Sequence, residues 1–443
     1  MTAGCERQVT VQAKWTAVSS TPVRPGKMYP LSVLDHAMAA HTLHMIFYYR
    51  PAPSTLTREK LYESLSDVLS HYPAVTGRLV RDGADKWAVK CNDAGVRMHD
   101  AKVALTLDEW FKSATAEDER DLTYWEPMVE DPSIWSPFYI QITEFKDNAF
   151  AIGLSLPHMH ADPACAALVI KAWGDAHRRS YIVNPPFFHP PGLLPRPQPN
   201  LSTQTAKFLA NKSQMAAAAS TTTTRCRMSS ATFRFSEEAV KSCFSQMHSA
   251  DDDCTKTTPF DILAALFWLS ISSSSSGGPA AALTLCVEFR KSMHAPLPYG
   301  FFGNALHFSK VEADLTSGWD SVAAAINRHL AGLEEEAYWS GIEWLNGNAQ
   351  KPFQMYGPEL TFIKMDHLLA YGAVFEKEGG GGKPVHVACR LGGVEGEGVV
   401  IVMPAAEEGM GRTVAVTLPE EAMEKLCKDD NILRHGPTIM FRG

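Results

Sequence analysis

The chain has 443 residues, of which 45% are hydrophobic and 20% are charged, and it carries a formal net charge of −8. This composition is typical of a soluble globular protein, and the length predicts two or three domains because it exceeds what one ordinary core holds. The acidic balance argues against nucleic acid or an anionic membrane as the main partner.

The cysteines and the first residues predict a cytoplasmic protein. Nine cysteines are scattered from Cys5 to Cys427 without a Cys-x-x-Cys pair or zinc-type histidine spacing, so we interpret them as free thiols in a reducing compartment. The first residues include charged side chains and lack the apolar region of a secretory signal. The longest apolar run, Ile262 to Ile271, is about half as long as a membrane span.

The first part of the chain alternates predicted strands and helices. A helix is expected to begin at Thr57 and to bury one apolar face, and the turn 146–148 is expected to join two strands into a hairpin. The predicted strands are 9–17, 45–49, 138–145 and 149–156, and the apolar face of the helix carries Leu61, Leu65, Val68 and Leu69.

The second strand of this hairpin leads into a histidine, an aspartate and an apolar helix. The stretch 149–156 is apolar and uncharged, and Pro157 ends its pairing, so His158 is expected at a strand terminus. Pro163 is tolerated in a first helical turn and is followed by apolar residues at helical spacing, which places Asp162 near a helix start. A histidine held there can accept a proton near neutral pH, because its ordinary pKa is about 6.5.

The His-x-x-x-Asp pattern alone is a weak signal, because the chain contains it twice. His248 to Asp252 also fits, but it lies in a polar, acidic stretch with no strand before it, so we interpret it as a solvated loop. From the residues alone, a structural histidine is as good an interpretation of His158 as a catalytic one.

Three further histidines lie around the second strand. His36, His41 and His44 have no carboxylate or cysteine partner at ligand spacing, so we interpret them as ordinary polar surface rather than a metal site.

The middle of the chain predicts a crossover between two domains. Residues 184–200 contain seven prolines, and an Ala/Ser/Thr-rich tract, 215–224, follows them. Beyond the crossover, Ser236 and Thr258-Pro259 are expected to cap helices. The other predicted elements are strands at 283–289, 398–403 and 413–418, a long amphipathic helix at 319–344, and flexible loops at 272–278 and 378–382.

Five motifs occur in one order, and by them the chain resembles the plant BAHD acyl-CoA-dependent acyltransferases, the HxxxD-type transferases. The five segments span nearly the whole chain, and so many matches in the order of the family are not expected by chance. They are LSVLD (31–35), LSHYPAVTGRLV (69–80), PHMHAD (157–162), VEFRKSMHAPLPYGFFGNAL (287–306) and LPEEAMEKL (418–426).

The resemblance implies an α/β, two-domain chloramphenicol-acetyltransferase-like fold with a solvent channel between the domains. It gives an N-terminal acyltransferase domain, 1–190, that carries the HxxxD motif, and a C-terminal acyltransferase domain, 226–443. The Pro-rich and Ala/Ser/Thr-rich crossover, 191–225, joins them. The resemblance also implies a monomer.

The resemblance assigns roles to single residues as well. The family's catalytic histidine carries over to His158 as the general base. The aspartate carries over to Asp162, which would pair with Arg290 and hold the turn so that the imidazole faces the channel. His160 is expected to be structural or channel-lining. Further motif or channel residues implied by the resemblance are Gly303, Asn304, Tyr371, Gly372 and Lys383.

The chain departs from the family pattern at two places. Before Lys383-Pro384 the family usually has Asp-Phe-Gly-Trp-Gly, whereas this chain has a glutamate and four glycines, 378–382. Either the motif has become this glycine run, or it lies at Tyr371-Gly372 with an insertion after it. The run lacks a Gly-Lys-Ser/Thr ending, so a flexible loop is favoured over phosphate binding. Pro163 stands where the family commonly has glycine, which fixes φ and removes an amide donor.

The resemblance implies transfer of an acyl group, hydroxycinnamoyl or another aromatic one, from acyl-CoA to a hydroxyl or amine of a plant specialised metabolite. Acyl-CoA is then a co-substrate, and neither metal nor redox cofactor is expected.

The alternative is a non-catalytic or accessory protein like the Eceriferum and Glossy branch, which supports very-long-chain fatty-acid elongation for cuticular wax with an elongase complex. Because His158, Asp162 and Arg290 are all present, we favour the enzyme. Shikimate is disfavoured as acceptor, because Lys364 or Met365 stands near the arginine of shikimate-type members.

Overall fold

The computed structural model describes residues 8–24, 26–51, 57–188, 193, 196, 200–219, 227–246, 257–274, 282–348, 353–376 and 382–443. The chain divides into two compact units. Unit 1 comprises Met1–Gly192, Pro298–Asn304 and Leu369–Gly392, and unit 2 comprises Leu193–Leu297, Ala305–Leu368 and Gly393–Gly443. Two segments from the later part of the chain therefore belong to the same unit as the HxxxD turn.

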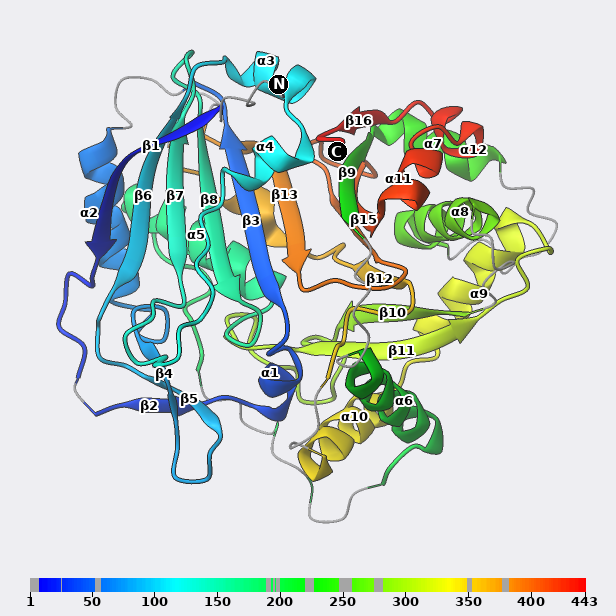
Figure 1. Cartoon of the computed structure of the whole chain (residues 1–443), viewed down its shortest axis with the longest axis horizontal. Coiled ribbons are helices and arrows are strands. Elements are labelled where there is room, and N and C mark those ends of the chain that lie inside the picture. Colours follow the sequence, from blue (N-terminus) through cyan, green and yellow to red (C-terminus); the bar gives the residue numbers. More distant parts are fainter. Residues whose placement is uncertain are drawn as a thin grey trace, which may run out of the picture. The chain divides into compact units, whose positions relative to one another are not determined.

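Unit 1 is built on a six-stranded sheet whose last edge strand comes from far along the chain (Figure 1). Neighbouring strands pair antiparallel, except that β6 and β7 run parallel. In spatial order the strands are β1 (Val9–Ala17), β6 (Val96–Val103), β7 (Tyr139–Glu144), β8 (Phe150–Pro157), β3 (Thr42–Tyr49) and β13 (Pro384–Gly392).

The strand β8 is buried along its whole length because it lies inside the sheet with both faces covered. The helix α5 (Pro163–His177) covers one face, and the segment after α4 (Ala116–Arg120) crosses the other (Figure 1). That crossing is close: a Cβ added at Gly153 would lie 2.0 Å from the carbonyl oxygen of Leu122. Glycine at this position is therefore a condition for the covering segment to approach the sheet.

Two helices of unit 1, α2 and α5, were expected from the sequence. The helix α2 begins after Thr57, whose side chain accepts a hydrogen bond from the backbone N–H of Lys60, and its predicted apolar face is buried. The predicted hairpin of β7 and β8 is confirmed, with Asn148 in its turn at a φ of 61°. The remaining helices are α1 (Val33–Ala37), α2 (Arg58–Leu69), α3 (Leu107–Ser113) and the 3₁₀ helix η2 (Leu369–Gly372), and a small sheet joins β2 (Met28–Pro30), β5 (Trp87–Lys90) and β4 (Arg78–Arg81).

Unit 2 is built on a seven-stranded mixed sheet. The strands β10, β12 and β14 run parallel to one another, and the other neighbouring pairs are antiparallel. In spatial order the strands are β11 (Leu306–Glu312), β10 (Ala282–Glu288), β12 (Thr361–Lys364), β14 (Val399–Pro404), β15 (Arg412–Pro419), β9 (Met228–Phe235) and β16 (Thr438–Met440).

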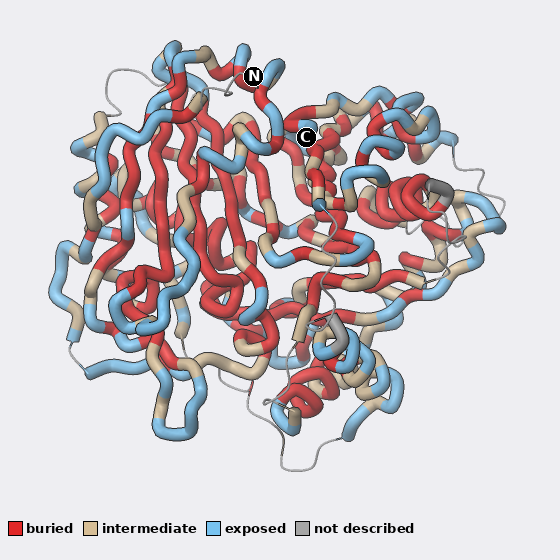
Figure 2. The backbone as a smooth tube through the Cα atoms, in the orientation of Figure 1, coloured by how far each residue is buried: buried red, intermediate tan, exposed pale blue. Residues whose placement is uncertain are grey.

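The core of unit 2 forms between this sheet and an apolar helix. The helix α8 is buried over most of its described side chains, including Trp268, and it appears red in Figure 2. As predicted, the side chains of Ser236 and Thr258 each accept a hydrogen bond from a backbone N–H in the following helical turn. The helices are α6 (Thr203–Ala219), α7 (Glu237–Gln246), α8 (Pro259–Ser274), α9 (Trp319–Ala331), α10 (Glu335–Gly347), α11 (Glu420–Leu426) and α12 (Asp430–Leu433).

Two sequence-based expectations are wrong in unit 2. The long helix predicted at 319–344 is two helices, because the chain leaves the helical path after Ala331: the N–H of Gly332 closes α9 onto Arg328, and α10 starts anew after Glu334. The loop predicted at 272–278 is wrong over 272–274, which are the last residues of α8. The predicted crossover, 191–225, contains the helix α6, whose Ala, Lys, Gln and Leu residues are strong helix formers and which packs on α10. The role of this crossover as the link between the domains stays a prediction. The rest of the loop predicted at 272–278, residues 275–278, lies outside the described residues, as do residues 378–381 of the loop predicted at 378–382 and the pair His248–Asp252.

We expect Gly153→Ala to destabilise the protein strongly. The added methyl group would overlap the Leu122 carbonyl, and neither the central strand nor the crossing backbone can move without breaking pairing. Urea unfolding should show a loss of about 3 kcal/mol or more. Gly347→Ala is the matched control, because nothing lies within 4 Å of its added Cβ, and it should be at least as stable as wild type, since alanine favours the helix α10. Wild-type stability of Gly153→Ala would contradict the close crossing.

Candidate active site

The predicted catalytic turn, 158–162, joins β8 to α5 in unit 1. The backbone N–H of His158 donates to the carbonyl of His41 at 2.9 Å, and the N–H of His160 donates to the carbonyl of Pro157 at 2.9 Å. The side chain of His158 is fully buried. These bonds fix the histidine at the end of a central strand, as the sequence predicts.

Asp162 fixes the other end of the turn. It is the N-cap of α5, and its Oδ1 accepts a hydrogen bond from the backbone N–H of Cys165 at 3.0 Å. Pro163 occupies the first helical position, where the missing N–H has no intrahelical acceptor to lose. The departure from the family's glycine is therefore compatible with a regular helix start.

Asn304 supports His158 from a distant segment of unit 1. Its side-chain amide donates to the carbonyl oxygen of His158 and to Oδ1 of Asp35, both at 2.8 Å, and its backbone N–H donates to the same Asp35 oxygen at 2.8 Å. The preceding Gly303 has a φ of 154°, and a Cβ there would lie 2.8 Å from the Phe301 ring. The predicted motif residues Gly303 and Asn304 thus lie next to the turn 158–162.

Asp35 completes this network, and the sequence did not single it out. Its other oxygen, Oδ2, accepts from the N–H and the hydroxyl of Ser32 at 2.8 and 2.7 Å, which closes a capping box around α1. Burial raises the pKa of Asp35, and the bonds from Asn304 and Ser32 oppose that rise. The signal for Asp35 was its place in the LSVLD segment, but no local pattern indicates a partner 269 residues away.

The environment of His158 keeps its imidazole neutral. Burial lowers the pKa of His158 below its ordinary value, because a charged ring is poorly solvated there. The backbone carbonyl of His158, the negative charge of Asp162 and the side chain of Asn304 act in the opposite direction. A neutral imidazole is the form that can accept a proton from an alcohol or amine.

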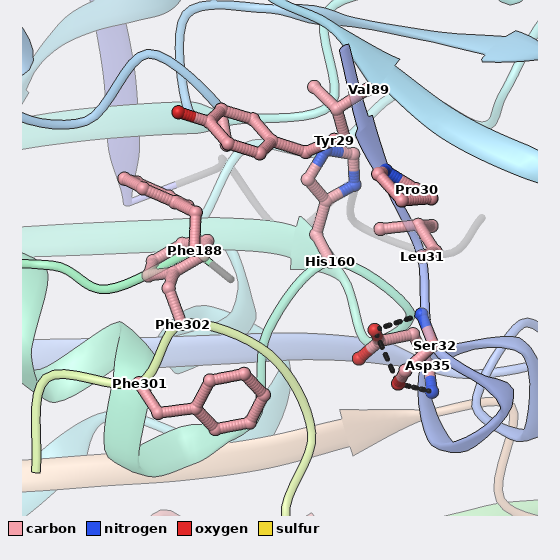
Figure 3. A pocket seen from close by; sticks show the side chains of 11 residues that line it. Tyr29, Pro30, Leu31, Ser32, Asp35, Val89, His160, Phe188, Phe301 and Phe302 are labelled. Atoms are coloured by element: carbon pink, nitrogen blue, oxygen red, sulfur yellow. Dashed lines mark hydrogen bonds between the residues drawn. The ribbon is translucent and has the colours of Figure 1, made fainter. Parts of the chain in front are cut away.

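His160 lines a small aromatic cavity rather than a reaction site. Figure 3 shows its ring near Tyr29 and Pro30, with Phe188 and Phe302 across the cavity. The volume is about 30 Å³, which leaves room for a water molecule but not for a metabolite. Burial lowers the pKa of His160 to about 3, and neither ring nitrogen has a hydrogen-bond partner within the described part of the chain. His160 therefore stays neutral and cannot exchange a proton near neutral pH.

Arg290 lies just after β10 in unit 2 and is buried. Its guanidinium lies 3.2 Å from the carboxylate of Glu288, which also accepts from the backbone N–H of Arg290 at 2.7 Å. The sequence did not single out Glu288. The ion pair between Asp162 and Arg290 would join residues of unit 1 and unit 2, and it stays a prediction.

The other predicted motif residues lie around β13 in unit 1. Tyr371 and Gly372 belong to η2, and the Tyr371 hydroxyl accepts from the backbone N–H of Val387 in β13 at 3.2 Å. Lys383 is exposed just before β13. Tyr371 thus supports the edge of the sheet, which is a packing role.

The expectation that His41 and His44 are polar surface is wrong. Both are buried, because β3 begins at Thr42, three residues earlier than predicted, and draws His44 into the sheet. The His44 ring bonds to the hydroxyls of Ser155 and Thr42, both at 2.9 Å. Within the described ranges, no cluster of three or more His, Cys, Asp or Glu side chains is arranged to hold a metal ion. None of the helices in the described part of the chain could cross a membrane.

Comparison with known proteins identifies relatives along nearly the whole chain. The Transferase family matches residues 7–433. Protein ECERIFERUM 2 of Arabidopsis thaliana is 26% identical over 429 residues, which cover 94% of this chain and 96% of that protein. A hydroxycinnamoyltransferase of Narcissus pseudonarcissus is 26% identical over 440 residues, which cover 92% of this chain and 97% of that protein.

Solved structures agree with the fold. Vinorine synthase superposes with a TM-score of 0.71 at 20% identity and covers 94% of this chain and 96% of its own. The TRI101 protein of F. graminearum, complexed with coenzyme A and deoxynivalenol, superposes with a TM-score of 0.72 at 15% identity. The match covers 94% of this chain and 100% of that chain. The predicted α/β, two-domain fold class is therefore confirmed, while the solvent channel between the domains stays a prediction.

We expect Asn304→Ala to lower both activity and stability. The change removes the amide that donates to Asp35 and to the His158 carbonyl, and an unsatisfied buried acceptor costs about 1–3 kcal/mol. A displaced His158 should lower kcat roughly tenfold or more with a smaller effect on KM. Asn348→Ala, which removes one bond to the Trp344 carbonyl in α10, is the control and should keep wild-type kcat. Full kcat in Asn304→Ala would refute the supporting role.

The substitution Asp162→Asn removes the negative charge of this side chain but keeps its ability to cap α5. Asparagine caps a helix as well as aspartate, so α5 should start normally. Because the Asp162 charge raises the pKa of His158, its loss should lower that pKa further and move the acid limb of kcat/KM to lower pH. If the predicted pair with Arg290 forms, the melting temperature and kcat should fall as well.

The control for this change is Asp429→Asn at the N-cap of α12, which should leave the pH profile unchanged. An Asp162→Asn protein with an unchanged profile and melting curve would remove both roles assigned to Asp162.

Proposed function

The chain belongs to the Transferase family, and on that premise we propose that it is an acyl-CoA-dependent acyltransferase with His158 as its general base. The acyl group is hydroxycinnamoyl or another aromatic one, and the acceptor is a hydroxyl or amine of a plant specialised metabolite. The observation that carries this proposal is the state of His158. Its backbone is fixed by His41 and Asn304, and its buried ring is held neutral.

The proposed reaction is direct transfer between two bound substrates. Nε2 or Nδ1 of His158 removes the proton of the acceptor hydroxyl or amine as that group attacks the thioester carbonyl. The resulting oxyanion requires a hydrogen-bond donor close by. When the carbon–sulfur bond breaks, the imidazolium returns its proton to the CoA thiolate, so the histidine is neutral again after each turnover. Holding both substrates together supplies the entropic part of the acceleration.

The supporting residues act on the orientation of the base. Asn304 and Asp35 hold the carbonyl of His158, and Asp162 stops the turn where α5 begins. The charge of Asp162 also stabilises the imidazolium formed after proton removal, since it raises the pKa of His158. The network therefore restrains the turn that carries the proposed base.

The relatives support an aromatic acyl donor. The match to a hydroxycinnamoyltransferase of Narcissus pseudonarcissus covers 97% of that protein. The match to Hydroxycinnamoyltransferase 1 of Oryza sativa subsp. japonica covers 98% of that protein. At 24–26% identity they indicate the donor class, and the side chains that select an acceptor can differ between such relatives.

A second candidate is an accessory role of the Eceriferum type, in which the protein supports very-long-chain fatty-acid elongation within an elongase complex. It is favoured by one observation: Protein ECERIFERUM 2 is as similar to this chain as the hydroxycinnamoyltransferase of Narcissus is, at 26% identity each. In that role His158 need not exchange a proton.

A thiol-release assay tests the enzyme proposal. The purified protein is incubated with aromatic, malonyl and fatty acyl-CoAs and a panel of alcohols and amines, and free CoA thiol is measured. We expect release that depends on the acceptor with an aromatic acyl-CoA. His158→Ala should lower kcat by about 10²–10⁴-fold, the usual contribution of a general base.

His71→Ala is the matched control, because it makes the same substitution at an exposed histidine. It should keep wild-type kcat. Full biological activity of His158→Ala in a complemented plant, together with no CoA release from wild type, would overturn the enzyme proposal and favour the accessory role.

A further inference from the structure

Unit 2 contains a groove of about 750 Å³ that the proposed acyl transfer does not use. Its walls are α6 and α9, and strands β10 and β11 contribute the ends that lie between them (Figure 1). The volume is within the range of small-molecule sites. None of the catalytic-turn residues lines it.

The groove offers apolar surface on the α6 wall. Phe208 is half-buried, and Met215, two turns further along the helix, is 43% exposed. Val311 of β11 and Ala325 of α9 line the space opposite them. A hydrocarbon body placed there would remove apolar surface from water at about 25 cal/mol per Å².

The α6 wall is fixed by a buried lysine. The Lys212 ammonium is almost fully buried and donates to the carbonyls of Met355 and Gly357 and to Oε1 of Glu359, at 3.0, 2.8 and 2.8 Å. The same Glu359 oxygen accepts from the Thr284 hydroxyl of β10 at 2.9 Å. These bonds tie helix to sheet, so the groove is built before any ligand arrives.

The charges of the groove are not balanced. Four basic side chains line it against two carboxylates, an excess of two positive charges in a chain whose net charge is −8. Lys212 is paired with Glu359 and Lys310 with Glu312, both at 2.8 Å.

Two cationic side chains of the groove are available to bind a ligand. Lys207 on α6 and Arg328 on α9 have no carboxylate partner among the described residues. His329 adds no charge, because burial lowers its pKa and its ring bonds to the Ser309 hydroxyl.

We propose that this groove binds an amphipathic organic anion. Lys207 and Arg328 hold a carboxylate or phosphate head, and a hydrocarbon body lies over Phe208 and Met215. The two cations without a carboxylate partner favour an anionic head, and the exposed apolar surface favours a hydrocarbon body.

Calorimetric titration of the full-length protein with three ten-carbon probes tests the proposal. Decanoate carries one negative charge, decyl phosphate carries up to two, and 1-decanol carries none. We expect both anions to bind, the phosphate more tightly, and the alcohol to bind at least roughly tenfold more weakly. Binding of the anions should weaken as salt rises, because the two cations lie at the surface.

Variants of the groove residues test where decanoate binds. Lys207→Ala combined with Arg328→Ala should weaken decanoate binding about tenfold, as expected for loss of charge-assisted contacts worth about 1.4 kcal/mol. Asn211→Trp, on the groove side of α6, should block the space and abolish binding. Lys425→Ala on α11, outside the groove, removes one exposed lysine and should bind like wild type.

His158→Ala should bind decanoate like wild type, so a failure of the acyltransferase proposal leaves this one intact. Equal affinity for decanoate and decanol, unchanged binding in the double variant, or displacement of decanoate by stoichiometric CoA would each overturn the groove assignment.

Discussion

The side-chain amide of Asn304 is the constraint on which the candidate site depends. It donates to a buried carboxylate oxygen of Asp35 and to the backbone carbonyl of His158, and a buried amide with two such acceptors has little freedom to rotate. Three sequence motifs, around residues 31–35, 157–162 and 298–304, are therefore one hydrogen-bonded structure. The position of the His158 ring is a property of all three.

Burial acts on this structure in two opposite ways. It lowers the pKa of His158 and raises the pKa of Asp35, because both charged forms lose their solvation. For the histidine this favours the proton-accepting form. For the aspartate, four hydrogen bonds from Ser32 and Asn304 oppose the rise and favour the carboxylate as an acceptor. The same buried environment thus acts on the candidate base and on the residue that supports it.

Local patterns predicted the elements that local forces decide. The strand at 9–17, the cap at Thr57, the hairpin before His158 and the cap of α5 were all readable, because alternation, helical spacing and capping residues act within a few positions. The break at Gly332 and the burial of His44 were not, since packing across the unit decides them. The Asn304–Asp35 bond was invisible because its partners are 269 residues apart. The family resemblance named Asn304 as a motif residue but gave it no partner.

The edge strand β13 ties the folding of unit 1 to a segment from the later part of the chain. It pairs along the length of β3 from Thr42 to Tyr49, yet its residues, 384–392, are synthesised after all the other strands of the sheet. Until then β3, whose residues from Leu43 onward are all buried in the finished protein, is an open and largely apolar sheet edge. The edge of β3 therefore stays open to other nascent chains until β13 has been synthesised, an exposure that a continuous N-terminal domain would avoid.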